Sequence, residues 1–389
     1  MLNAIAVVAL LTGPLSSTGP SQDDGPVVNV WTIAPLAGGS RAALGCADAS
    51  IRIVDTATGE LVRTLSCPDG PPDELLAAPS GGRIAVGTQG REGPKGSRTK
   101  VWRWSVVDVG APDQAAFTRL GEKLGWSSYA RFDREGGRVV VWSEESAATV
   151  HDAASGKKLF DLGDDDERIL AVCWAEATDQ IVTGGAKGSI RTWQADTGKP
   201  GAARKGATRT ECVEVSPDGR SVFCGSEYVR GAIWSLPELE FGSQFRASGS
   251  WLMAPDDRIA RAAWAPDGSR LHFTTMPWHT LECRSSDGKL FWQADSNGGR
   301  EEALDVAMEP GGRRVAVPRW NERTVFDART GENLGSGIGV AYPRAVTWTT
   351  DGTRLLLLHK FRIRILSAET LTLERELAVT RDGVRLHDD

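Results

Sequence analysis

A turn repeats along this chain at a nearly constant spacing. Its clearest copy, Ser-Pro-Asp-Gly at Ser216–Gly219, stands between two short runs of alternating apolar and polar residues. Because Pro pre-sets one turn angle and Gly tolerates positive φ, this copy predicts a β-hairpin. The turn glycine advances from Gly39 to Gly352 in seven steps, a mean period of about 45 residues. The repeat overrides the two or three domains that 389 residues would otherwise suggest.

The repeat divides the chain into eight units, each with room for four short strands. They are Val27–Leu65, Glu74–Leu120, Ser127–Leu162, Arg168–Arg204, Thr210–Phe245, Ile259–Ala294, Ala303–Gly335 and Arg344–Val379. This period is typical of propeller blades. We therefore predict an all-β fold, a single β-propeller over residues 27–379 with eight four-stranded blades. Seven blades are the alternative, since the second unit is the least clear.

The two ends of the predicted ring leave its closure open. Val27–Ile33 could form an innermost strand or pair with the last blade. Residues 380–389 resemble a third strand without partners, so we expect an untethered C-terminal tail.

Within the units, the first strand ends in a large apolar residue just before the turn. These residues are Phe132, Trp174, Val215, Trp264, Met308 and Trp348. Smaller apolar residues stand two positions earlier, so both sets share one face at the period of a strand. Such strands suit blades that pack face to face around an axis. The run Asp-x-x-Thr/Ser-Gly, as at Asp55–Gly59, predicts a further turn in which Asp caps amides and Gly is left-handed.

In its repeats the sequence resembles the WD40-repeat β-propeller family, in a degenerate form, from Val27 to about Val379. The resemblance is carried by the Ser-Pro-Asp-Gly-type turns, by the strands Ile190–Trp193 and Ala232–Trp234, and by the Thr-Gly turns that follow them. It implies a platform that binds a protein or peptide partner. No unit has a Trp-Asp dipeptide and no Gly-His pair precedes a first strand, so the family's side-chain hydrogen-bond tetrad is not carried over.

Composition and the N-terminal residues limit which partners and which compartment are expected. The net charge is −6 and the charged residues are scattered, which argues against nucleic acid because phosphate neutralisation dominates that binding. The apolar run Ala4–Leu11, followed by small residues, predicts a signal peptide and linker over residues 1–26 and hence an exported protein, although no basic residue precedes it. If the run is not a signal, the cytoplasm is expected. No run approaches a membrane span, and we expect a monomer.

Six cysteines are present, and one pair permits a geometric argument. Cys212 and Cys224 are nearly equidistant from the centre of the Ser216–Gly219 turn, so a tight turn would place them opposite each other. A disulfide and two buried thiols both remain open. The sequence contains no C-x-x-C motif, so no metal or other cofactor is expected.

The residues offer little for catalysis. The five histidines fall in different units: His151, His272, His279, His359 and His387. No nucleophile elbow, P-loop or dinucleotide fingerprint is present. The alternative is a secreted propeller enzyme using the central channel, since Asp287–Trp292 and His151–Phe160 resemble docking turns of quinoprotein dehydrogenases. Only Trp292 matches that family's motif well, and its adjacent Cys pair is missing. We therefore predict a protein that is not an enzyme.

Binding is expected in loops on one face of the ring. Large aromatic residues occur there in neighbouring blades five to seven, accompanied by basic residues: Tyr228, Trp251, Trp278, His279, Arg319, Trp320 and Arg323. Trp and Tyr dominate interface hot spots, so this set predicts a partner-binding patch. The alternative is that each aromatic side chain only covers the apolar edge of a blade. Two charged stretches on the same face, Gln89–Lys100 and Asp164–Glu167, are interpreted as solvated loops.

Overall fold

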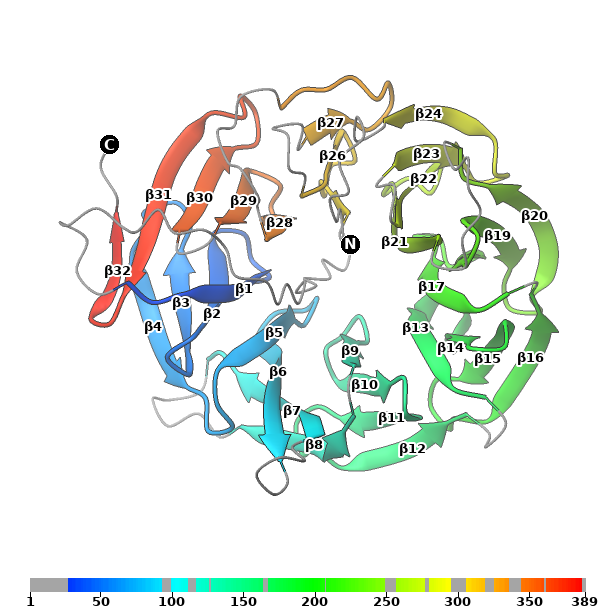
Figure 1. Ribbon diagram of the computed structural model, residues 1–389, viewed down its shortest axis with the longest axis horizontal. Helices are drawn as coiled ribbons and strands as arrows, with labels where there is room; N and C mark the ends of the chain where they lie inside the picture. The colour runs from blue at the N-terminus through cyan, green and yellow to red at the C-terminus, as the bar shows by residue number, and fades with distance from the viewer. Residues whose placement is uncertain are drawn as a thin grey trace.

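The computed structural model describes residues 27–92, 99–110, 117–125, 127–163, 167–206, 208–248, 257–276, 280–294, 306–318, 325–335, 344–359 and 362–386. Figure 1 shows eight small sheets arranged in a ring around a central opening. All sheets are antiparallel, and consecutive strands of each are neighbours. The prediction of an eight-bladed all-β propeller is confirmed. No helix in these ranges is long and apolar enough to cross a membrane.

Strands run from the centre outward in sequence order. The first four blades comprise β1 (Val30–Pro35), β2 (Arg41–Cys46), β3 (Ser50–Asp55), β4 (Leu61–Ser66); β5 (Pro72–Ala77), β6 (Arg83–Glu92), β7 (Thr99–Asp108), β8 (Thr118–Leu124); β9 (Ser128–Phe132), β10 (Arg138–Ser143), β11 (Ser146–Asp152), β12 (Lys158–Leu162); β13 (Ile169–Ala175), β14 (Gln180–Gly185), β15 (Ser189–Gln194) and β16 (Pro200–Lys205). The second unit, the least clear in sequence, is thus a complete blade.

The remaining blades differ more from one another. They comprise β17 (Thr210–Val215), β18 (Ser221–Ser226), β19 (Arg230–Ser235), β20 (Glu240–Arg246); β21 (Arg258–Trp264), β22 (Arg270–Met276), β23 (Leu281–Ser285), β24 (Leu290–Ala294); β25 (Ala307–Met308), β26 (Arg314–Ala316), β27 (Val325–Asp327); β28 (Ala345–Trp348), β29 (Arg354–His359), β30 (Arg362–Ser367), β31 (Leu373–Thr380) and β32 (Gly383–Leu386). In blade seven Asn333 bridges to Phe326 beside β27, in the place of a fourth strand.

The predicted hairpin turns form as expected. At the clearest copy, the Gly219 amide donates to the Ser216 carbonyl at 2.8 Å, and Gly219 has a φ of 71°. The fourth unit has no glycine at this turn. There a short 3-10 helix, Glu176–Thr178, ends at Asp179 in the left-handed conformation. The Asp-x-x-Thr/Ser-Gly turns also form, as at Asp55, whose carboxylate accepts the amides of Ala57 and Thr58.

Indole groups join blades four, six and eight each to the blade before it. Trp174 is the second-last residue of the first strand of blade four, and Trp264 and Trp348 end the first strands of blades six and eight. Their Nε1 groups donate to the carbonyls of Arg131, Glu214 and Ala307 in blades three, five and seven, at 3.1, 3.0 and 3.0 Å. The equivalent residues of those odd blades are Phe132, Val215 and Met308. From blade three to blade eight, this position of the repeat therefore alternates between a purely apolar side chain and an indole that donates a hydrogen bond.

Outer strands dock on the glycine turns of the next blade. Phe160, Phe245 and Trp292 on β12, β20 and β24 lie against Gly198, Gly288 and Gly331, all of which have positive φ. The Trp292 indole also donates to the Ala328 carbonyl at 3.2 Å. The docking turns noticed in the sequence thus serve blade packing.

The ring closes between blades one and eight. β1 is the innermost strand of blade one, whereas Val27 bridges to Thr380 and the Val28 amide donates to the Val379 carbonyl at 2.7 Å. Both alternatives for the N-terminal segment therefore hold: Val27 and Val28 pair with the last blade, and the residues from Val30 onward form an innermost strand. A shared core, including Leu44, Leu356 and Leu377, fills the junction. The expectation of an untethered tail is wrong, because β32 pairs with β31 as a fifth strand.

The geometric argument on Cys212 and Cys224 is also wrong. The turn spans one residue more than assumed, so Cys224 pairs with Val213 and Cys212 with Gly225. Adjacent strand positions face opposite sides of a sheet, and the two thiols accordingly lie in different cores. All six cysteines are buried and free. Burial raises the pKa of Cys46 to about 11 and that of Cys283 to about 12, so these thiols stay protonated at neutral pH.

Candidate partner-binding face

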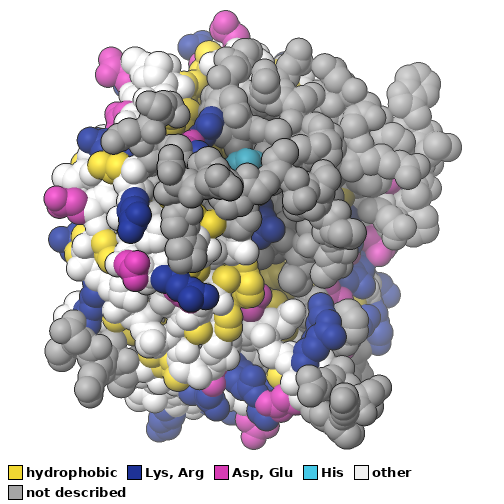
Figure 2. Space-filling view, turned by 60° about the vertical axis from the view of Figure 1, so that its left-hand side comes forward, with side chains coloured by type: hydrophobic (Ala, Val, Ile, Leu, Met, Phe, Trp, Pro, Cys, Tyr) yellow, Lys and Arg dark blue, Asp and Glu magenta, His cyan; other side chains and the backbone are white. Residues whose placement is uncertain are grey.

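One end of the ring collects the connections from second to third strands and between blades. The tight turns such as Ser216–Ser221 lie at the opposite end of the same strands, because neighbouring strands are antiparallel. We call the end that carries the connections the connection face. Figure 2 shows acidic and basic side chains interspersed with small apolar patches on the side in view, rather than one field of a single sign.

Tyr228 lies on the connection face in a strained segment between β18 and β19. Tyr228 and Val229 have φ values of 56° and 48°, in the left-handed region. A β-branched residue is a rare occupant of that region, and each such residue costs roughly 1–2 kcal/mol. The surrounding structure must therefore hold this conformation.

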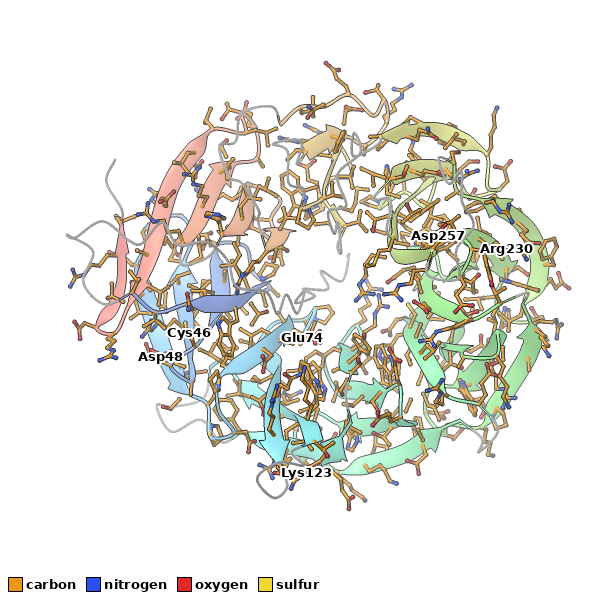
Figure 3. The ribbon with its side chains drawn as sticks, viewed as in Figure 1. Cys46, Asp48, Glu74, Lys123, Arg230 and Asp257 are labelled. Carbon is orange, nitrogen blue, oxygen red and sulfur yellow. The ribbon has the colours of Figure 1, made fainter. Side chains whose placement is uncertain are left out.

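Three hydrogen bonds hold the Tyr228 segment. The Val229 amide donates to the Asp257 carbonyl at 3.2 Å, and the Val229 carbonyl accepts the Ala247 amide at 2.9 Å. The Glu227 amide donates to the Arg209 carbonyl at 3.3 Å. Figure 3 shows Arg230 and Asp257 beside this junction of blades five and six. Tyr228 is half-buried while Val229 packs in the core, so the strain fixes the direction of the tyrosine.

A chain of ion pairs extends from this junction across the connection face. Arg209 contacts Glu211 at 2.7 Å and Glu144 at 3.4 Å, and Arg258 contacts Glu211 at 3.2 Å. These residues come from blades three, five and six. The alternating charges link three blades at the end of the ring where partners are expected. The sequence analysis did not identify these ion pairs. The available signal was that Arg209 and Arg258 both stand near the start of a first strand.

The central channel contains a second ion pair that spans three blades. Arg131 of β9 contacts Glu214 of β17 at 2.9 Å and donates to the Val172 carbonyl of β13 at 3.3 Å. Equivalent first-strand positions of the other blades hold Ala, Leu, Cys or Thr. Glu74 lies on the inner strand of blade two, beside the opening (Figure 3). The charges of Arg131 and Glu214 offset each other on the inner strands.

The two buried histidines have structural contacts. His151 contacts the Gly156 carbonyl through Nδ1 at 3.1 Å and the Thr149 hydroxyl through Nε2 at 2.8 Å. His272 Nε2 donates to the Ala328 carbonyl at 2.9 Å. No group of three potential metal ligands gathers anywhere in the ranges that the model describes.

Most of the predicted patch lies outside the described residues. These are Trp251, Trp278, His279, Arg319, Trp320 and Arg323, together with the acidic run 164–166. Tyr228 is the member that the structure places, and it lies on the predicted face.

Comparison with known proteins finds one protein that is similar in sequence over part of the chain and one solved structure that is similar in fold. No family model matches the chain. Eukaryotic translation initiation factor 3 subunit I of Kluyveromyces lactis is 32% identical over 108 residues, which are 27% of this chain and 30% of that protein. The chain thus aligns with less than a third of that relative's length. The β-propeller domain of Cps50 (Swd1) from Myceliophteria thermophila has a TM-score of 0.55 at 14% identity, over 79% of this chain and 95% of that domain.

The comparison corrects one expectation. The two similar proteins are intracellular eukaryotic proteins, which points to the cytoplasm or nucleus. The interpretation of Ala4–Leu11 as the mark of an exported protein is therefore wrong. The six free, buried thiols agree with a reducing compartment.

The fold and the relatives agree on the resemblance that the repeats suggested. The eight contiguous blades, the tight glycine turns and the similarity to a WD40 protein and to a solved propeller all point the same way. This chain is an eight-bladed β-propeller whose degenerate repeats resemble those of the WD40 family.

Proposed function

We propose that this protein is a non-catalytic interaction platform that binds a protein or peptide partner through the connection face of blades five to seven. The strained Tyr228–Val229 segment carries the proposal. Left-handed non-glycine residues persist only where the surroundings enforce them, and they cluster at functional sites. Its position beside the ion pairs of Arg209, Glu211 and Arg258 supports a contact surface with both an aromatic and a charged part.

The proposed contact residues are those of the predicted patch: Tyr228, Trp251, Trp278, His279, Arg319, Trp320 and Arg323. The protein that is similar over part of this chain is by its name a subunit of a translation initiation factor, which supports the same class of role here. Neither nucleic acid nor a cofactor enters the proposal, and we expect the chain to act as a monomer.

The test is capture followed by a quantitative binding assay. The purified chain is crosslinked to proteins of a cell extract, the captured protein is identified, and its affinity is measured by calorimetry. We expect Tyr228→Ala, and the triple variant Trp251→Ala, Trp278→Ala and Trp320→Ala, each to weaken binding by about tenfold or more.

Phe241→Ala is the matched control. Phe241 is 59% exposed, but it lies on the outer strand β20, away from the connection face. Its removal should leave the affinity unchanged. If the Tyr228 and Trp variants unfold at lower temperature yet bind as tightly as the wild type, these aromatic residues only cover blade edges.

A further inference from the structure

Two arginines lie opposite each other at the connection-face end of blade five. Arg230 begins β19 and Arg246 ends β20, and the antiparallel ladder pairs them directly. Paired residues of neighbouring strands share one face of the sheet, and like charges so placed are unfavourable. Arg246 is exposed and Arg230 is half-buried, on the outer half of the blade (Figure 3). The blade therefore holds two positive charges side by side, where solvent reaches them.

Neither of these two arginines has an acidic partner. Among the residues that the structure describes, none forms an ion pair with either guanidinium. Other arginines of the same region differ in this respect. Arg209 and Arg258 both contact Glu211, and Arg284 contacts Glu282 at 2.8 Å. The positive charge of the pair is thus available to an anion from outside the chain.

Hydrogen bonds of the backbone hold both arginines in place. Arg230 directly follows the strained Tyr228–Val229 segment, and the Ser226 hydroxyl donates to the Arg230 carbonyl at 3.2 Å. The Arg246 carbonyl accepts a hydrogen bond from the Arg284 guanidinium at 2.9 Å. Because the backbone is already ordered, a ligand that binds the two side chains has less conformational entropy to offset.

A third arginine comes from the facing surface of blade four. Arg204 on β16 is two residues after Ala202, which packs on the core between blades four and five. Arg230 is likewise two residues before Ala232, which packs on the same core. Side chains two positions apart on a strand share a face, so Arg204 and Arg230 both point into this junction. We call Arg204, Arg230 and Arg246 the arginine cluster.

Nearby acidic residues form no ion pair with the arginine cluster. The Arg204 guanidinium donates to the Ala203 carbonyl at 2.9 Å, a partner without net charge. Glu238 and Glu240 stand at the turn that joins β19 to β20, at the opposite end of these strands. Glu227 lies just before β19, but no ion pair joins it to the cluster. The cluster is therefore a basic site whose charges have no counterpart among the described residues.

We propose that the arginine cluster binds an acidic segment, rich in Asp and Glu, of the partner protein. Guanidinium groups pair bidentately with carboxylates, and arginine clusters are an established means of recognising acidic motifs. A carboxylate bound between Arg230 and Arg246 also relieves the repulsion between them. This inference rests on the proposed platform function and names the chemistry of the segment that lies beside Tyr228.

The test uses the full chain and a fluorescein-labelled peptide of about ten residues in which Asp and Ser alternate. Fluorescence anisotropy should show saturable binding that weakens as the salt concentration rises. The double variant Arg230→Gln, Arg246→Gln should weaken this binding about tenfold or more, and Arg204→Gln alone should weaken it by a smaller factor. Arg246 is exposed, so Arg246→Gln alone provides the same comparison without a change in packing.

The melting temperature separates binding from a structural role. The double variant should melt at the same temperature as the wild type or at a higher one, because it removes the repulsion between two like charges. A lower melting temperature together with unchanged peptide affinity would show that the two arginines only stabilise the blade.

Arg220→Gln is the matched control, because Arg220 is exposed at a tight turn on the opposite end of the same blade. It should leave the peptide affinity unchanged, and a peptide with Asn in place of Asp should not bind. The proposal is overturned if the wild type does not bind the Asp peptide. Tighter binding of a single-stranded DNA of equal charge would overturn it as well, since the cluster would then recognise phosphate.

The outcomes distinguish this inference from the proposed function. Binding of the captured partner that Tyr228→Ala does not affect contradicts the proposed function and leaves the peptide result standing. Equal peptide affinity of the double variant and the wild type contradicts the role of the arginine cluster and leaves the result for Tyr228 standing.

Discussion

At the scale of single residues, indole nitrogens determine how strongly neighbouring blades adhere. The Trp174, Trp264 and Trp348 donors each satisfy a carbonyl of the preceding blade, within a largely buried junction. Trp234 is equally buried, but its nitrogen has no acceptor among the described residues. The same residue type thus makes a bond between blades at some positions and only fills space at another.

Trp174→Phe should lower the free energy of unfolding by about 1–2 kcal/mol beyond the loss of packing, because the Arg131 carbonyl loses its donor. Trp234→Phe should lower the free energy of unfolding by less, because it removes a buried nitrogen that has no hydrogen-bond partner among the described residues. Urea unfolding monitored by circular dichroism measures both. Equal losses would show that the indole bond contributes nothing between blades.

His272 makes stability depend on pH. It is fully buried, and burial lowers its pKa to about 4. Because Nε2 donates to the Ala328 carbonyl, protonation would place a proton on Nδ1, which has no partner among the described residues. The unfolded chain binds this proton below about pH 6.5, so the stability from neutral His272 is present at pH 7 and decreases as pH falls from about 6.5 to 4.

His272→Gln should flatten this dependence. Glutamine can donate to the Ala328 carbonyl but does not titrate. Between pH 7 and 4, the free energy of unfolding of the variant should therefore fall by up to about 3 kcal/mol less than that of the wild type. Denaturant unfolding at pH 7, 5.5 and 4.5 provides the comparison. Parallel curves for the two proteins would contradict the assignment.

At the scale of elements, the contact between an outer strand and the next blade's glycine turn recurs around the ring. The side chain of Trp292 occupies the position where a Cβ on Gly331 would lie, with Cδ2 at 2.6 Å from it. The φ of Gly331 is 75°, which side chains other than that of Gly rarely adopt. Space and conformation both require glycine there.

Gly331→Ala should therefore destabilise the protein by about 2 kcal/mol or more, through backbone strain and displacement of the indole. Gly82→Ala is the control: its φ is 80°, but nothing lies within 4 Å of a Cβ there. The difference between their melting temperatures reports the docking contact alone. A similar loss in both variants would assign the whole effect to backbone conformation.

At the scale of the whole molecule, the ring depends on the junction of its first and last blades. β32 extends blade eight, and Leu386 lies against Gly59 of blade one. Val384 packs on the core that the two blades share. The last strand thus reinforces the junction that the Val27 and Val28 contacts make.

Deleting residues 382–389 should destabilise the ring by about 1–3 kcal/mol, because it exposes this core and leaves β31 as the edge. Deleting only residues 387–389 keeps β32 and should leave stability unchanged. Hydrogen exchange of β1 and β31 should accelerate in the longer deletion alone. Unchanged exchange at both strands would mean that the ring closes without β32.

The sequence by itself determined the repeat, and with it the eight blades, the glycine turns and the all-β class. Period-two apolar strands and glycines at positive φ are local properties, which the chain carries residue by residue. Tyr228 lies between a second and a third strand, on the connection face, and its role in binding stays a prediction. The other patch residues lie outside the described structure, so their joint role stays a prediction.

Only the tertiary structure decided which groups meet. One extra turn residue shifted the strand register, so that Cys212 and Cys224 face opposite sides of their sheet. The ring also brings together residues that are distant in sequence, such as Arg131 with Glu214 and β32 with Gly59. Register and long-range contacts depend on the geometry of the closed ring, whereas turns and strand faces depend on neighbouring residues alone.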